Sequence, residues 1–285
     1  MSLEVIIPAF EPDEKLDKLV DRLTKQTMKP DRIRVLLTTS KPDEVLELKR
    51  RLNNNALVEF VLPEDFSHGG TRQRGMDESD ADYVLMMTQD AVPVDRELTQ
   101  RLYEALQSDG AAAAYARHLP LKDADPVEKF SRHFNYPKIS SVQSAADLKT
   151  KGIRAVFMSD TCCMYRHDIF NELGGFERYT DFNEDSIFAY NAIMAGYSII
   201  YCAEARVFHS HSLSLKEQFK RNRAIARCQK EHSDIYGNLG SEHEGLRYFK
   251  EGALYFFKHG EPLNIVRLFL SCGFRYAGYF CGKHF

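Results

Sequence analysis

The chain of 285 residues contains no tryptophan, no Cys-x-x-Cys pair and no run of 18 apolar residues. The last absence argues against a helix that crosses a bilayer. The six cysteines have no regular spacing, and a bridge between the adjacent Cys162 and Cys163 would be strained. We therefore expect reduced cysteines in a cytosolic protein. The N-terminus lacks the basic segment of a signal peptide, and Pro8 ends its short apolar run, which is typical of a first strand.

The chain also lacks a strong excess of charge of one sign, because it has 38 Lys+Arg and 41 Asp+Glu. The resulting net charge of -3 gives no reason to expect a nucleic-acid partner. The balance conceals an asymmetry, since residues 213–285 carry 12 Lys+Arg against 7 Asp+Glu. A basic tail on an acidic body indicates contact with an anionic surface. The apolar content of 44% and the charged content of 28% are those of a globular protein.

Buried strands and amphipathic helices alternate along the first 90 residues. We expect strands at 3–7, 33–37, 57–62 and 83–87, and helices at 14–25, 45–52 and 71–79. This alternation predicts an α/β fold with a doubly wound, mostly parallel sheet flanked by helices.

The middle of the chain is less regular. We expect helices at 95–107, 168–176 and 186–195 and strands at 111–116, 156–165 and 198–202. Residues 120–152 carry many polar and turn-forming residues, which predicts a mobile excursion over the site.

From residue 215 onward the pattern is predominantly helical, with one apolar face made by Leu246, Phe249, Ala253 and Phe256. The final 38 residues hold 11 of the 33 aromatic residues. So much aromatic surface must be covered by the body of the protein, by a second subunit or by lipid.

Asp90 lies just beyond the apolar run 83–87, in Thr88-Gln-Asp-Ala91. A residue there stands at the carboxyl edge of a parallel sheet, where open α/β folds bind their ligands. The alternative for Asp90 is a structural helix cap.

Five motifs follow one another along the chain: Pro8 at the end of the first strand, His68-Gly-Gly-Thr-Arg72, Thr88-Gln-Asp-Ala91, Asn183-Glu-Asp185 and His209-Ser-His211. Their order resembles the family 2 glycosyltransferases of GT-A fold, and within them the bacterial rhamnosyltransferases that build polysaccharides on a lipid carrier. The resemblance covers nearly the whole chain, including the ending Gly278-Tyr-Phe-Cys-Gly-Lys283.

The resemblance implies a Rossmann-like GT-A catalytic domain over residues 1–212, followed by a helical, basic, aromatic-rich region over residues 213–285. Within the catalytic domain, residues 1–117 would form the nucleotide-sugar half and residues 118–212 the acceptor half.

By this resemblance Asp90 binds a divalent cation, Mn²⁺ or Mg²⁺, that bridges the carboxylate to the donor's phosphates. His209 would be a further ligand, with His211 nearby, and Mn²⁺ tolerates such nitrogen ligands better than Mg²⁺. The family's usual Asp-x-Asp is replaced by Thr88-Gln-Asp90, so this position offers a single carboxylate. The alternative for His209 is a hydrogen-bonded structural histidine.

The resemblance makes Asp185 the general base that takes the proton of the acceptor hydroxyl, and makes Glu184 a group that binds the acceptor. Both carboxylates precede the helix expected from residue 186, whose positive end would keep them ionised. The alternative is that they only cap this helix.

The remaining predicted site residues bind the donor. Arg72 and His68 lie in a glycine-bearing loop that lets a nucleotide approach closely, and Gln89 adjoins Asp90. Pro8, Phe10, Glu11 and Thr39 would frame the base, although Thr38-Thr-Ser40 stands where the family usually has an Asp. The alternative for Arg72 is a surface ion pair. Arg221 could meet the donor diphosphate or the acceptor's pyrophosphate, or could belong to a solvated basic face.

The function implied is the inverting transfer of L-rhamnose from dTDP-rhamnose to a lipid-linked oligosaccharide at the cytoplasmic face of the membrane, with peripheral membrane contact through the C-terminal region. Two alternatives stay open: a different donor, such as a UDP-hexose or an N-acetylhexosamine nucleotide, and a non-catalytic protein that binds sugar nucleotides or glycans. A nucleotidyltransferase would need a glycine-rich basic loop after the first strand, which Pro8-Ala-Phe-Glu-Pro12 is not. The oligomeric state is not predicted.

Overall fold

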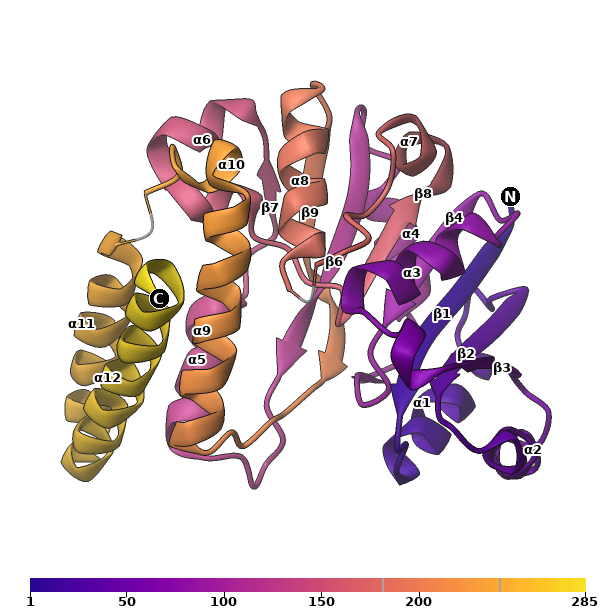
Figure 1. Ribbon diagram of the computed structural model, residues 1–285, viewed down its shortest axis with the longest axis horizontal. Helices are drawn as coiled ribbons and strands as arrows, with labels where there is room; N and C mark the ends of the chain where they lie inside the picture. Colours follow the sequence, from indigo (N-terminus) through magenta and orange to yellow (C-terminus); the bar gives the residue numbers. More distant parts are fainter. Residues whose placement is uncertain (181, 241) are drawn as a thin grey trace.

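The computed structural model describes residues 1–180, 182–240 and 242–285. These residues form one mixed sheet of nine strands with helices on both faces, and a group of C-terminal helices stands beside one end of the sheet (Figure 1). The strands follow the order β3-β2-β1-β4-β8-β6-β9-β5, and β7 pairs with β9.

The first half of the sheet is parallel, as the alternation predicts. Its strands are β1 (Leu3–Phe10), β2 (Arg32–Thr38), β3 (Leu57–Val61) and β4 (Tyr83–Met87). The connecting helices are α1 (Glu14–Thr24), α2 (Pro42–Arg51) and α3 (His68–Asp77), with a 3₁₀ turn η1 (Pro63–Asp65) before α3. The side chain of Asp13 caps α1 by accepting a hydrogen bond of 2.9 Å from the Lys15 N–H.

The second half mixes both strand directions. It contains β5 (Val92–Pro93), α4 (Leu98–Ala105), β6 (Ala111–Leu119), β8 (Cys162–Arg166), α7 (His167–Glu172), α8 (Glu184–Met194) and β9 (Ser198–Phe208). Strand β8 lies between β4 and β6 and is antiparallel to both, whereas β6 and β9 are parallel.

Two apolar cores lie on opposite faces of the sheet. Helices α1, α2 and α4 cover one face, and helices α3, α7 and α8 cover the other. The second face carries the aromatic cluster of Tyr165, Phe170, Phe176 and Phe188. Rings in such edge-to-face contact add to the stabilisation that burial alone provides.

The segment over residues 120–152 is more regular than its composition predicts. It folds into α5 (Pro126–Asn135), β7 (Ser141–Gln143) and α6 (Ala145–Lys151). The strand expected at 156–165 was also wrong in its first half, where the 3₁₀ turn η2 (Gly152–Val156) and an irregular stretch precede β8. Helix α5 forms because Val127 and Phe130 are buried against the C-terminal helices, a long-range contact that local pattern does not reveal.

The C-terminal region is helical, as expected. Its helices are α9 (Leu215–Glu231), α10 (Ser233–Tyr236), α11 (Glu242–Lys258) and α12 (Pro262–His284). The apolar face expected on α11 was wrong in part: Tyr248 and Phe256 are buried against Phe130 and Leu268, whereas Leu246 is exposed. Among the described residues, none of the helices combines the length and apolarity needed to cross a membrane.

Two glycines of the closing motif let α12 lie directly against α9. A Cβ on Gly278 would fall 2.3 Å from the Phe219 carbonyl oxygen, and one on Gly282 would fall 2.2 Å from that of Arg223. Both obstacles are backbone atoms of another helix and cannot move without separating the pair.

We expect Gly278→Ala to lower the free energy of unfolding by about 1–3 kcal/mol, because the added methyl group forces the two helices apart. Gly273 is the matched control, since it lies in the same helix with nothing within 4 Å of its Cβ direction. Gly273→Ala should instead stabilise the protein by about 0.5–1 kcal/mol. Urea unfolding of both variants checks this, and equal effects would contradict the close contact between α9 and α12.

Candidate active site

Asp90 and His209 are brought together by the pairing of two short strand ends. Strands β5 and β9 are antiparallel, with Val92 opposite Phe208, so the residues just outside the pair become neighbours. The Asp90 Oδ2 atom lies 3.5 Å from His209 Nε2 and 3.2 Å from His211 Nε2. These three side chains form a compact group whose ligand atoms all lie within 4.8 Å of one another.

The chemistry of this group fits a divalent cation. Asp90 Oδ2 is buried and has no hydrogen-bond donor among the described residues. Burial, followed by the nearby His118, lowers the pKa of His209 well below its usual value, so this imidazole is neutral and can donate its lone pair. One carboxylate oxygen and two imidazole nitrogens suit a transition metal such as Mn²⁺ better than Mg²⁺. His211, which the motif placed only nearby, belongs to the group as fully as His209.

His118 lies behind the histidines and was not expected from the sequence. Its ring is fully buried, stacks on Tyr136 at 4.0 Å between centroids, and meets His209 edge-on at 5.4 Å. Burial lowers the pKa of His118 well below its usual value. His118 is therefore neutral, and its ring, stacked on Tyr136, packs against the ring of His209.

Asp185 lies in the first turn of α8, which begins at Glu184, two residues earlier than expected, after Asn183 in a left-handed conformation with φ of 67°. Its Oδ1 accepts a 2.7 Å hydrogen bond from the Ser186 N–H, and its Oδ2 accepts one of 3.4 Å from the Asp160 N–H. Burial and the charge of Glu184 nevertheless raise the pKa of Asp185 to about 7. The expectation that the helix end keeps this group fully ionised was therefore wrong, because the positive helix end is outweighed by loss of solvent and by a like charge.

Beside Asp185 lies a buried cluster of one guanidinium and two further carboxylates. Arg72 is 6% exposed, and its Nη1 lies 2.9 Å from Glu184 Oε1 while its Nε lies 3.5 Å from Asp160 Oδ2. Burial alone would lower the pKa of Arg72, but the charges of Glu184 and Asp160 raise it above its usual value. Burial raises the pKa of Asp160 well above its usual value, although Arg72 opposes this, and the Tyr165 hydroxyl donates a hydrogen bond to it.

Asp160 was missed by the sequence analysis. It lies in the irregular stretch before β8 and matches none of the five motifs, and only its burial beside Arg72 identifies it. Arg72 is likewise not part of a surface ion pair. Its predicted contact with the donor stays a prediction, as does the contact of Glu184 with the acceptor.

The metal-binding group and the Asp185 cluster stand at the same edge of the sheet. The Thr88 N–H, two residues before Asp90, donates a 3.2 Å hydrogen bond to the carbonyl of Thr161. Asp160, which precedes Thr161, donates its N–H to the Asp185 carboxylate. Two acidic residues 95 positions apart in sequence are thus linked through the backbone of residues 160 and 161.

The predicted donor-binding residues lie around the ends of β1, β2 and β4. Gln89 accepts a hydrogen bond of 2.9 Å from the Phe10 N–H and donates one of 3.0 Å to the Phe10 carbonyl, and so ties the first loop to Asp90. Phe10 is exposed, Glu11 has a φ of 44°, and the Thr39 hydroxyl bonds to Glu44. Pro8 lies in β1, within the sheet. The contact of these side chains with a nucleotide stays a prediction.

The glycine-bearing loop expected before residue 71 is the first turn of α3, which begins at His68. Gly69 and Gly70 serve close packing there, because a Cβ on Gly69 would fall 2.0 Å from the Glu177 carbonyl oxygen. The His68 ring packs against Phe66 and Phe182. His68 and Arg72 therefore project from a helix that is anchored to the segment before α8.

A groove of about 780 Å³ opens next to the metal-binding group, between α5, α9 and α12. His211, Tyr136 and Arg221 line it where it meets the site. The location of Arg221 is thus compatible with a phosphate contact, and its partner stays a prediction.

The pKa of Asp185 predicts the acidic limb of the rate profile. A general base must be deprotonated, so kcat/KM should fall about tenfold per pH unit below pH 7. Glu184 is the charge that most raises this pKa, so Glu184→Gln should move the limb to lower pH. If the acidic limb of kcat/KM lies at the same pH in Glu184→Gln as in the wild type, the charge of Glu184 does not raise the pKa of Asp185.

Solved structures with this fold are GT-A glycosyltransferases. The mannosyltransferase PcManGT from Pyrobaculum calidifontis, determined with GDP-Man and Mn²⁺, matches with a TM-score of 0.65 at 12% identity over 99% of this chain and 87% of its own. TarS residues 1–349 from S. aureus, in complex with UDP-GlcNAc, match with a TM-score of 0.56 at 13% identity over 99% of this chain and 89% of their own. The chain thus has the GT-A fold.

The chain belongs to glycosyl transferase family 2, whose model matches residues 4–174. It is 35% identical over 288 residues to the O-antigen chain rhamnosyltransferase RfbN of Salmonella typhimurium, covering 100% of this chain and 90% of that protein. It is 31% identical to the O-antigen chain rhamnosyltransferase WbaN of Salmonella anatum, covering 99% of this chain and 90% of that protein. The resemblance inferred from the five motifs is confirmed.

Proposed function

We propose that this protein is an inverting rhamnosyltransferase that uses dTDP-rhamnose and extends a lipid-linked oligosaccharide in the synthesis of a cell-surface polysaccharide. The sugar follows from the relatives, two O-antigen chain rhamnosyltransferases that match the chain almost from end to end. The chemistry follows from one observation: Asp185, with a pKa of about 7, stands at the same sheet edge as the metal-binding group.

The reaction needs one base and one leaving group. The acceptor hydroxyl oxygen forms a bond to the anomeric carbon, the bond from that carbon to the nucleoside diphosphate breaks, and the hydroxyl proton passes to Asp185. Attack opposite the departing diphosphate inverts the configuration. A pKa of about 7 lets Asp185 be free of a proton at the start and hold one at the end.

Asp90, His209 and His211 would hold the divalent cation. When bound, the cation neutralises the charge that develops on the departing diphosphate. The protein's own part is to position the ligands: His118, which stacks on Tyr136, packs against the His209 ring, and Gln89 ties the turn before Asp90 to the first loop. The donor's base would lie between Phe10, Glu11 and Thr39, where the first loop is held by Gln89.

We expect chelation with EDTA to abolish transfer and Mn²⁺ to restore it. Asp90→Asn should lower kcat/KM by about 10²–10³-fold, since it removes the only charged ligand of the group. Full activity in EDTA after exhaustive dialysis would contradict a cation at Asp90.

The proposed location is the cytoplasmic face of the membrane, in peripheral contact through the C-terminal helices. Large apolar side chains of α12 are exposed in this structure, among them Leu263, Val266, Phe269 and Phe274. Each Lys or Arg close to anionic lipid adds roughly 1 kcal/mol to such an attachment.

The function is tested by offering a panel of dTDP-, UDP- and GDP-sugars with Mn²⁺ and a synthetic lipid-linked saccharide. Transfer from dTDP-rhamnose, and from no UDP-hexose or UDP-N-acetylhexosamine, is expected. Transfer only from a UDP-sugar would contradict rhamnose as the transferred sugar and would identify the UDP-sugar as the donor. Binding of donors without turnover under any condition would make the protein a binding module.

A further inference from the structure

The groove between α5, α9 and α12 gathers arginines from three helices. Arg132 comes from α5, Arg221 from α9, and Arg267 and Arg275 from α12. Figure 1 shows α9 beside α12 at one end of the sheet, with α5 behind α9, and α12 contacts both. Neither the five motifs nor the chemistry assigned to Asp185 accounts for this grouping.

The arginines are only partly balanced by acidic groups. Arg267 lies 3.6 Å from Asp125, and Arg132 lies 3.8 Å from Glu128, which also accepts a hydrogen bond from the His211 N–H. Among the described residues, no carboxylate lies within 4.0 Å of the guanidinium of Arg221 or Arg275. Arg275 donates instead to the Gln218 side chain at 3.0 Å and lies over the ring of Tyr248.

Arg132 and Arg275 act on Arg221 as like charges. The protein atoms that surround Arg221 lower its pKa, and the charges of Arg132 and Arg275 lower it further. Three carboxylates, those of Asp125, Glu128 and Glu217, also line the groove, but none of them pairs with Arg221 or Arg275. Guanidinium groups that face one groove without a carboxylate partner are stabilised by an anion that carries more than one charge. A diphosphate has that charge and enough oxygens to meet two or three guanidinium forks.

The groove also has the right neighbours for an acceptor. His211 lines it and is part of the metal-binding group, while Tyr136 lines it and packs against His118. The charge of Asp185 acts on both Arg221 and Tyr136. A diphosphate in this groove would therefore lie beside the metal-binding group, because His211 belongs to both.

The groove also adjoins exposed apolar surface. Leu270 lines the groove, and with Leu263, Val266 and Phe274 it forms an exposed stripe along α12. These positions recur at helical spacing, so they lie on one side of the helix. A polar nucleoside would gain little from contact with such an apolar stripe, whereas an isoprenoid chain can bury its surface along it.

We propose that this groove binds the diphosphate of a polyprenyl-diphosphate-linked acceptor, with Arg132, Arg221 and Arg275 on the phosphates and the prenyl chain leaving along α12. This inference rests on the proposed function for the sugar that is transferred, but the binding of the lipid diphosphate can be measured separately. It gives Arg221 the acceptor as its partner, in place of the donor.

The test is calorimetric titration of the full-length protein with farnesyl diphosphate, farnesol, inorganic diphosphate and dTDP-rhamnose. The wild type should bind farnesyl diphosphate more tightly than farnesol or inorganic diphosphate, because both halves of the ligand contribute. The double variant Arg132→Gln/Arg275→Gln should lose at least about tenfold in affinity for farnesyl diphosphate, with its affinity for dTDP-rhamnose within about twofold of the wild type.

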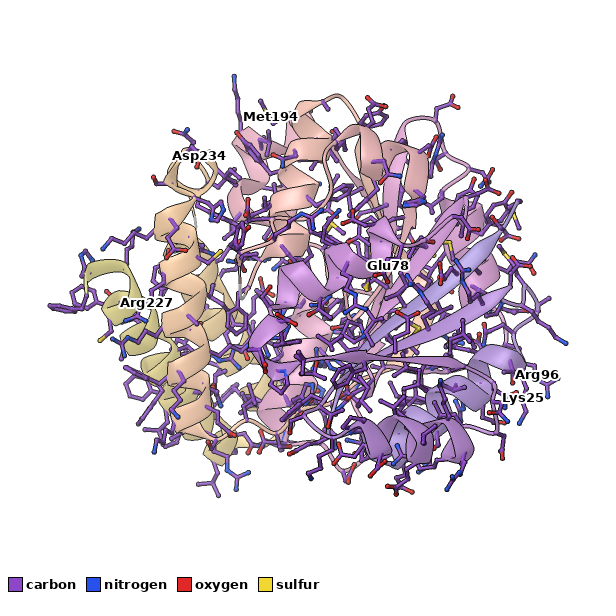
Figure 2. The ribbon with its side chains drawn as sticks, turned by 45° about the vertical axis from the view of Figure 1, so that its right-hand side comes forward. Lys25, Glu78, Arg96, Met194, Arg227 and Asp234 are labelled. Atoms are coloured by element: carbon purple, nitrogen blue, oxygen red, sulfur yellow. The ribbon has the colours of Figure 1, made fainter. Side chains whose placement is uncertain are left out.

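Arg227→Gln is the control, because Arg227 is an exposed arginine of α9, the helix that carries Arg221, and does not line the groove (Figure 2). Its affinity for farnesyl diphosphate should be unchanged. The affinity of Arg275→Lys for farnesyl diphosphate should lie between those of the wild type and Arg275→Gln, because lysine keeps the charge but cannot form two parallel hydrogen bonds. Thermal melting verifies that each variant is folded.

The inference is overturned if the double variant loses dTDP-rhamnose and keeps farnesyl diphosphate, which would assign the arginines to the donor. It is also overturned if Arg227→Gln weakens binding as much as the double variant, or if inorganic diphosphate binds as tightly as farnesyl diphosphate. Failure of rhamnose transfer in the donor panel leaves these titrations unaffected, so the two proposals can fail separately.

Discussion

Asp185→Asn should lower kcat roughly 10³-fold, because a general base typically contributes a factor of 10²–10⁴ to the rate. The amide has the same size and can still accept the hydrogen bond from the Ser186 N–H, so the first turn of α8 should persist. What it cannot do is take up the acceptor's proton. Steady-state kinetics with dTDP-rhamnose and a lipid-linked acceptor measure the loss, and titration should show donor affinity close to that of the wild type.

Asp168 supplies the control for this substitution. It is also a carboxylate in the first turn of a helix, α7, but it is exposed and pairs with Arg166 at 2.6 Å. Asp168→Asn should leave kcat within about twofold of the wild type. Retained transfer in Asp185→Asn would remove Asp185 from the chemistry, and an equal loss in both variants would indicate a structural effect of helix-start carboxylates.

Arg72→Met is expected to destabilise the fold by about 3–5 kcal/mol, because it leaves buried carboxylates without their counter-charge. Arg72 is the only cation that contacts Glu184 and Asp160 among the described residues, and both carboxylates are buried. The loss should shrink as the pH falls, because burial raises the pKa of Asp160 and of Asp185, and their protonation removes repulsion that the variant leaves uncompensated. Urea unfolding at several pH values measures both effects.

Arg178→Met is the comparison, because Arg178 and Asp77 form an ion pair that is exposed on both sides. Solvent screens such a pair, so the expected loss is below about 1 kcal/mol. If Arg72→Met keeps wild-type stability and loses donor affinity alone, then Arg72 contacts the nucleotide, as the motif predicted, and its contacts with Glu184 and Asp160 contribute little to the fold.

The parallel half of the sheet could be predicted because buried parallel strands are continuous apolar runs. Strands β1, β2, β3 and β4 all fall within a few residues of their expected bounds. The antiparallel insertion of β8 between β4 and β6 could not be predicted, because strand order depends on long-range pairing that a local pattern does not contain.

The site shows the same division between local and long-range information. Asp90, Asp185 and His209 were predicted as site residues from motifs at the ends of elements and from the family resemblance, and their roles stay predictions. Asp160 and His118 were missed, because they are identified only by contacts with residues distant in the sequence. Asp160 contacts Arg72, and His118 contacts Tyr136 and His209.

The charge state of Asp185 also required the structure. A carboxylate at a helix start is ordinarily stabilised in its ionised form. Here burial and the adjacent Glu184 reverse that effect and bring its pKa to the pH at which the enzyme would work. The sequence shows the adjacent acid but gives no information about its burial.

The most direct test is the anomeric configuration of the transferred rhamnose, read from the one-bond carbon–hydrogen coupling at its anomeric carbon in the donor and in the product. A single displacement assisted by Asp185 predicts that the configuration in the product is the inverse of that in dTDP-rhamnose. A product that keeps the donor's configuration would exclude a single displacement from the opposite face and would contradict the role given to Asp185.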